Sequence, residues 1–137
     1  MRLCAELKFS TTALFFLEDI VMSIDEIFAK LAIHMKEGIA MHEDFVTIFG
    51  FLSLNGFKKC HYYHYLEEIK NYNTLYHYYM SHYHKLINVE EIPKLKVISS
   101  SWYKYDQFAV DNNTRRNTIK DIVKQWIDWE KSTKDLL

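Results

Sequence analysis

Histidine is the residue type of this sequence that best suits metal chemistry, and the chain contains seven of them. His61, His64 and Glu68 are spaced so that they share one face of a helix. If the chain reverses direction near Asn55, His42 of the preceding segment comes level with them. Two imidazoles and a carboxylate can bind iron, zinc or manganese. The sequence therefore predicts a metal site at His42, His64 and Glu68, with His61 available as a fourth ligand.

The same histidines have a structural interpretation, in which they are exposed or satisfied by a neighbouring tyrosine or carboxylate. The sequence holds no G-x-G-x-x-G, G-x-x-x-x-G-K-[ST], G-x-S-x-G or H-E-x-x-H motif, and its three glycines leave little for a phosphate-binding loop. No catalytic residue is predicted, so the sequence favours a non-enzymatic protein. We expect Glu37 and Glu43 to be exposed charges and Cys60 to be a small buried side chain.

Tyrosine is the second distinctive residue type, because eight of the ten tyrosines lie between Tyr62 and Tyr83. Helical spacing predicts a largely aromatic buried stripe made of Tyr62, Tyr65, Leu66, Ile69, Tyr72, Tyr76, Tyr79, Tyr83 and Leu86. Tyr63 and Tyr78 fall off this stripe, and tyrosine is enriched at protein interfaces. We therefore predict an interaction surface at Tyr63 and Tyr78 for a homodimer or a protein partner. The alternative is a core whose tyrosine hydroxyls reach water.

Two long helices must position these residues. Apolar side chains recur at helical spacing from Ser23, where a Ser-x-x-Glu capping box opens a helix predicted over about residues 23–53. Gly38 lies on its apolar stripe, where we expect it to admit a neighbouring backbone. A turn at Leu54-Asn55-Gly56 leads into an antiparallel helix over about residues 56–87. Asn71 to Thr74 are poor helix formers, so a kink or a break there is the alternative.

The sequence after the hairpin predicts one further helix. Pro93 excludes a helix through the connector that follows the hairpin. The last helix, over about residues 112–136, starts where good N-cap residues cluster. The predicted fold is all-α: an antiparallel helical hairpin plus a C-terminal helix, in a bundle of three to four helices.

Charge and composition exclude several classes of protein. Basic and acidic residues number 17 and 18, whereas nucleic-acid binding needs a basic excess. The last helix does carry a partial basic face, so a small nucleic-acid-associated regulator is the second alternative; the face comprises Arg115, Arg116, Lys120 and Lys124. The two cysteines form no C-x-x-C pair, and no apolar run approaches the roughly 20 residues that span a bilayer. We expect a reduced, cytoplasmic protein without a membrane segment.

Residues 1–21 differ from the rest of the chain because they lack a helical stripe. The codons for Glu18 and Asp19 can contain the purine-rich core of a ribosome-binding site. Such a site would lie a short distance upstream of the Met22 codon, where translation would then begin. We interpret residues 1–21 as a mis-translated or disordered leader and residues 22–137 as a single helical domain. The alternative is a genuine N-terminal strand or arm.

The sequence carries two resemblances. The hairpin of residues 23–87, with inward imidazoles and carboxylates, resembles ferritin-like helical bundles, which implies metal storage or oxidase chemistry; the Glu-x-x-His motif of that class is absent. Two parts are similar to small uncharacterised proteins of Gram-positive bacteria and their phages or mobile elements: residues 56–68, and Ser101–Tyr103 together with Trp126–Glu130. This second resemblance implies no activity. A non-enzymatic interaction or accessory protein is the leading interpretation, and a metal-binding bundle is the first alternative.

Overall fold

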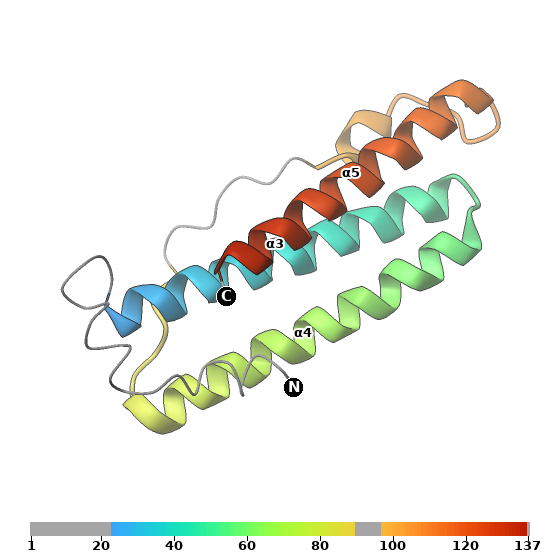
Figure 1. Cartoon of the computed structure of the whole chain (residues 1–137). Helices are drawn as coiled ribbons and strands as arrows, with labels where there is room; N and C mark the ends of the chain where they lie inside the picture. The colour runs from blue at the N-terminus through green and yellow to red at the C-terminus, as the bar shows by residue number, and fades with distance from the viewer. Residues whose placement is uncertain (1–22, 90–96, 137) are drawn as a thin grey trace.

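The computed structural model describes residues 23–89 and 97–136, where the chain forms long helices and no strand (Figure 1). The elements are α3 (Ile24–Phe51), α4 (Asn55–Tyr83), the short 3₁₀-helix η1 (Ser99–Trp102) and α5 (Asn112–Leu136). This confirms the predicted all-α fold with a helical hairpin and a C-terminal helix. None of the helices in these two ranges combines the length and the hydrophobicity that crossing a membrane requires. The predicted leader, residues 1–21, lies outside the described residues.

α3 and α4 form the antiparallel hairpin. The Ser23 hydroxyl accepts the backbone N–H of Glu26 at 3.3 Å, as expected from the capping box. The connection between the helices lies about two residues earlier than predicted, because α3 ends at Phe51, Ser53 turns the chain with a left-handed φ of 57°, and α4 begins at Asn55. Gly56 therefore lies inside α4 and not in the turn.

α4 runs without a break, so the alternative of a helix broken near residues 71–74 is wrong. Leu75 is only 1 % exposed against α3, and the Thr74 hydroxyl donates to the Lys70 carbonyl within the helix at 2.8 Å. Burial of this stretch outweighs the weak helix propensity of its asparagines, which costs only tenths of a kcal/mol per residue, about 0.7 at most. The bundle consequently has three long helices in the described ranges.

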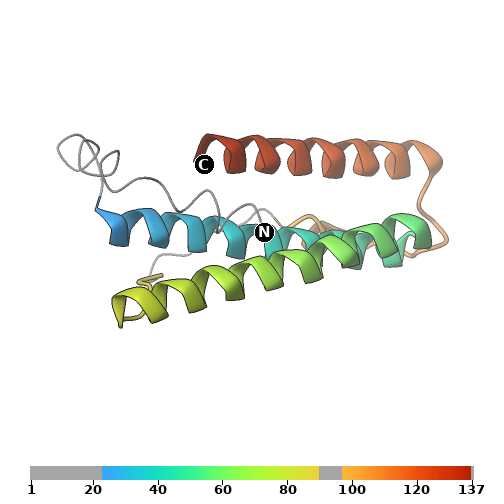
Figure 2. The ribbon, with the colours of Figure 1, turned by 60° about the horizontal axis from the view of Figure 1, so that its bottom comes forward.

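α5 packs along α3 and runs antiparallel to it (Figures 1 and 2). The Trp129 indole lies directly against Gly38, and its Nε1–H donates to the His34 carbonyl at 3.2 Å. The His34 ring stacks on the same indole, with ring centroids 4.7 Å apart. Gly38 thus admits an aromatic ring, and our expectation of a neighbouring backbone is wrong.

The core consists of two clusters at opposite ends of α3. The first contains Met41, Phe45, Ile48, Phe49, Leu52, Trp102, Val110, Ile122 and Trp129. The second contains Phe28, Leu31, Ala32, Met35, Leu75, Tyr79 and Ile87. His42 follows Met41 at the edge of the first cluster that is nearer the second, and it is completely buried.

Two charged side chains attach residues 97–115 to α3. The buried Asp44 carboxylate accepts the backbone N–H groups of Ile98 at 2.7 Å and Ser99 at 3.0 Å, and also the Ser99 hydroxyl. Arg115 donates to three carbonyl groups, one of which belongs to Leu52 at the end of α3; the others are those of Gln107 and Val110. Arg115 is therefore turned inward, which weakens the predicted basic face of the last helix.

Candidate functional site

Three imidazoles meet where α3, α4 and α5 approach one another. His42 comes from α3, while His61 and His64 come from successive turns of α4. His42 and His61 are buried, and His64 is half-buried. The sequence-based alignment of the two helices therefore placed these residues correctly.

The rings of the three histidines are in mutual contact. The Nδ1 atoms of His42 and His61 lie 3.1 Å apart, at hydrogen-bond distance. The His64 ring centroid is 5.3 Å from that of His42 and 6.2 Å from that of His61. Trp126 of α5 lies against all three imidazoles, at centroid distances of 5.8, 4.9 and 4.8 Å. We call His42, His61 and His64 the imidazole cluster.

Burial keeps two members of this cluster neutral at pH 7. Desolvation, and then the neighbouring rings of His61 and His64, lower the pKa of His42 to about 3. Desolvation and the neighbouring His64 lower the pKa of His61 to about 4. Between two neutral rings, one Nδ1 donates a proton to the other. The second nitrogen of His42, Nε2, is buried without a hydrogen-bond partner.

Glu68 belongs to a different environment from the one predicted. It lines a cavity of about 190 Å³ between the three helices, together with Leu31, His34, Met35, Asn71, Trp129, Glu130 and Thr133. Desolvation, followed by the carboxylates of Glu130 and Glu67, raises the pKa of Glu68 to about 7. In residues 23–89 and 97–136, no three His, Cys, Asp or Glu side chains are arranged to hold a metal ion. The predicted set of His42, His64 and Glu68 therefore does not form such a group.

Two residues on α4 differ from their sequence-based prediction. Cys60 is exposed, because the buried side of α4 begins with the next residue, His61. Tyr78 is half-buried: its ring stacks on Phe28 with centroids 6.1 Å apart and on His82 at 4.0 Å. Of the two tyrosines assigned to an interaction surface, only Tyr63 is free of the core, at 59 % exposure.

The buried side of α4 is rotated relative to the predicted stripe. Tyr62 and Leu66 were expected to be buried, but they are 48 % and 43 % exposed. They lie beside Tyr63 on the outer side of α4, since residues three and four apart are neighbours on a helix surface. We call Tyr62, Tyr63 and Leu66 the α4 surface.

Sequence reasoning assigned no site role to the α5 side chains that cover the imidazoles. Trp126 contacts the cluster, and its Nε1–H donates to Glu130 at 3.1 Å. The spacing of Trp126, Trp129, Glu130 and Thr133 on one side of the last helix was the signal that could have linked them.

Comparison with known proteins adds no identity. No protein-family model, no curated protein and no solved structure matches the chain. The resemblances to ferritin-like bundles and to proteins of Gram-positive bacteria and their phages accordingly stay predictions.

Proposed function

We propose that this chain is a cytoplasmic, non-enzymatic interaction protein that binds a protein partner through the α4 surface. The observation that supports this proposal is the exposure of Tyr62, Tyr63 and Leu66 on a helix whose other side is packed against α3. Tyrosine serves well at interfaces because its ring buries a large apolar area while its hydroxyl keeps a polar contact. A cluster of such side chains is more informative than single exposed apolar residues.

Charged side chains of both signs surround the α4 surface, because the exposed Glu67 lies four residues after Tyr63 and two lysines lie nearby. Lys59 and Lys70 lie four residues before Tyr63 and four residues after Leu66, on the same side of α4. Both lysines are exposed. A polar rim around an apolar centre is the common anatomy of a protein interface.

The first partner to test is a second copy of the chain. We expect light scattering of the full chain to show a concentration-dependent dimer, and Tyr63→Ser combined with Leu66→Ser to weaken it by about tenfold or more, about 1.4 kcal/mol. Both side chains are exposed, so the change should leave the circular dichroism spectrum and the unfolding midpoint nearly unchanged.

Tyr103→Ser is the matched control, because Tyr103 is 89 % exposed but lies outside α4. Its dimerisation should equal that of the wild type. A chain that stays monomeric at its highest soluble concentration would rule out self-association. An equal loss in Tyr103→Ser would contradict the assignment to α4.

A second candidate function, metal binding, is favoured by one observation at the imidazole cluster. The buried imidazoles of His42 and His61 and the half-buried imidazole of His64 would offer nitrogen ligands, and the buried Nε2 of His42 has no partner in the described residues. Nitrogen ligands of this kind suit zinc or iron. Because Glu68 lies near Glu130, the ligands would be His42, His61 and His64 without it, and their rings would have to reorient on binding, since the described residues hold no three such side chains already arranged around a metal.

Elemental analysis of protein purified without chelators or a histidine tag tests this candidate. Metal binding predicts near-stoichiometric zinc, iron or manganese that is lost in His64→Ala. His77→Ala is the matched control, because His77 is exposed on the same helix. Protein that carries no metal, takes up none from added zinc and unfolds identically with EDTA would retire the metal candidate and leave the α4 surface proposal untouched.

A further inference from the structure

One side of α5 exposes two large aliphatic side chains. Val123 is 40 % exposed and Ile127 is 46 % exposed, whereas Ile122 on the side that packs against α3 is completely buried. α5 forms one edge of the bundle (Figure 2). Because residues four apart are neighbours on a helix surface, the two side chains form one apolar patch, and the half-buried Trp126 lies next to it.

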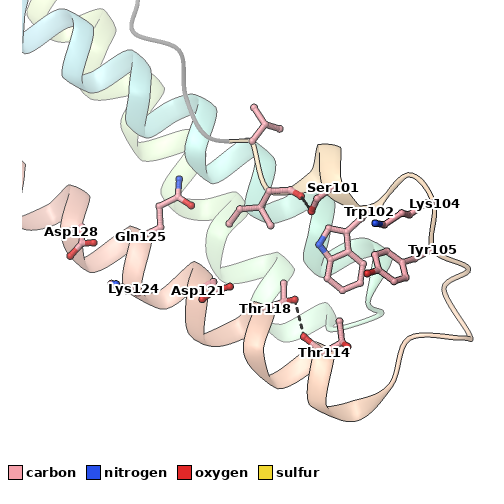
Figure 3. Close-up of a pocket in the computed structure, with 12 residues that line it drawn as sticks. Ser101, Trp102, Lys104, Tyr105, Thr114, Thr118, Asp121, Lys124, Gln125 and Asp128 are labelled. Carbon is pink, nitrogen blue, oxygen red and sulfur yellow. Dashed lines mark hydrogen bonds between the residues drawn. The ribbon is translucent and has the colours of Figure 1, made fainter.

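The side of α5 that faces residues 97–105 has a different character. It borders a groove of about 630 Å³ with polar side chains, namely those of Thr114, Thr118, Asp121, Gln125 and Asp128 (Figure 3). Lys104 and Lys124 line the same groove and balance its two aspartates, so its charge selects no ligand. The apolar patch lies apart from this groove.

Opposite charges flank the apolar patch at its two ends. Lys120 lies three residues before Val123, and Glu130 lies three residues after Ile127, a spacing that keeps all four on one side of the helix. Both charged side chains are exposed. No ion pair within residues 23–89 and 97–136 involves Lys120, and Glu130 accepts the Trp126 indole N–H through one oxygen. We call Lys120, Val123, Ile127 and Glu130 the α5 surface.

We propose that the α5 surface binds the same surface of a second copy of the chain, with the two α5 helices antiparallel. Val123 then packs on the partner's Ile127, and the same register brings Lys120 level with the partner's Glu130. The two-fold axis repeats both contacts, which gives two ion pairs around an apolar centre. A parallel pair would instead place Lys120 against the partner's Lys120, and Glu130 against the partner's Glu130. Charge complementarity therefore selects a second copy in the antiparallel orientation.

One like-charged pair lies further out at each end of this contact. Arg116 comes level with the partner's Lys134, about 10 Å along the helix from Val123. Packed helices cross at an angle and diverge away from the crossing point, and salt screens exposed charges. The inner pairs of Lys120 with the partner's Glu130 consequently dominate the electrostatics of the dimer.

Sedimentation velocity of the full chain carrying Tyr63→Ser and Leu66→Ser tests the proposal without a contribution from the α4 surface. We expect this parent variant to form a concentration-dependent dimer. Lys120→Glu added to it should weaken the dimer by about tenfold or more, because two ion pairs become two like-charged pairs. Glu130→Lys should have the same effect. Lys104→Glu, at an exposed lysine on the groove side, is the control and should dimerise as the parent does.

Exchange of the two charges tests the antiparallel register. Lys120→Glu combined with Glu130→Lys should restore the dimer to within about twofold of the parent, because both ion pairs form again with their signs reversed. An equimolar mixture of the two single variants should form mixed dimers for the same reason. A variant that merely damaged the fold would be recovered in neither experiment.

Three results would overturn the proposal. The first is a parent variant that stays monomeric at its highest soluble concentration while its circular dichroism spectrum shows it to be folded. The second is a Lys120→Glu variant that dimerises as tightly as the parent. The third is a double exchange variant that is folded but does not recover the dimer. Each leaves the α4 surface proposal untouched, because the α4 side chains are already substituted in all these proteins.

Discussion

Gly38→Ala should lower the free energy of unfolding by about 1–3 kcal/mol, although alanine is the better helix former. A Cβ atom at this position would lie 2.8 Å from Cε2 and Cη2 of Trp129 and closer still to Cζ2. The indole cannot withdraw easily, because it donates to the His34 carbonyl and stacks on the His34 ring. The substitution therefore pushes α5 away from α3. Urea unfolding followed by circular dichroism measures the loss.

Gly56→Ala is the matched control for this prediction. Gly56 also lies in a helix, but a Cβ atom added there meets nothing within 4 Å. We expect it to be neutral or to gain up to about 1 kcal/mol, the opposite sign to Gly38→Ala. In a Trp129→Leu background the penalty at Gly38 should shrink, because the overlapping ring is gone. A neutral Gly38→Ala in the wild type would show that Trp129 does not rest on α3.

Acid should destabilise the protein well above the pH at which carboxylates protonate. Between pH 6.5 and about 4, the unfolded chain binds protons at His42 and His61 that the folded chain excludes. Stability is therefore fully present above pH 6.5 and falls as the pH is lowered, by about 1.4 kcal/mol per pH unit for each imidazole. Urea unfolding across this pH range measures the slope.

Glu68 has the opposite effect on the pH dependence of stability, because its pKa is raised from 4.5 to about 7. The folded chain holds a proton on Glu68 that the unfolded chain releases, so this group lowers stability as the pH rises from 4.5 to 7. Between pH 4.5 and 6.5 the combined slope from His42, His61 and Glu68 should be about 1.4 kcal/mol per pH unit, two imidazoles against one carboxyl. Glu68→Gln should raise it to about 2.7 and should stabilise the protein at pH 8.

Substitution of a histidine separates the contributions of the individual imidazoles to the pH dependence of stability. His61→Phe removes one titrating imidazole and should reduce the slope by about half in the Glu68→Gln background. His77→Gln, at an exposed position of the same helix, should leave it unchanged. A flat stability profile from pH 4.5 to 6.5 in Glu68→Gln would mean that the imidazole cluster is protonated in the folded state.

The sequence by itself determined the helices and the alignment of the hairpin. Apolar spacing and the Ser23 cap place the start of α3 correctly, and a short turn leaves antiparallel packing as the only compact arrangement. That arrangement was enough to bring His42 level with His61 and His64, because helices of fixed rise, about 1.5 Å per residue, keep their register over many residues.

Only the tertiary structure decided which way each helix faces and which distant residues meet. Aromatic side chains surround most of α4, so periodicity could not show that Tyr62 and Leu66 are exposed while Tyr78 is packed. Glu68 lies one turn beyond His64, yet α5 places the Glu130 carboxylate beside the same cavity, where its charge helps to raise the pKa of Glu68. The position of α5 depends on side-chain shape, namely an indole that fits against Gly38, and local spacing does not encode such contacts between residues some 90 positions apart.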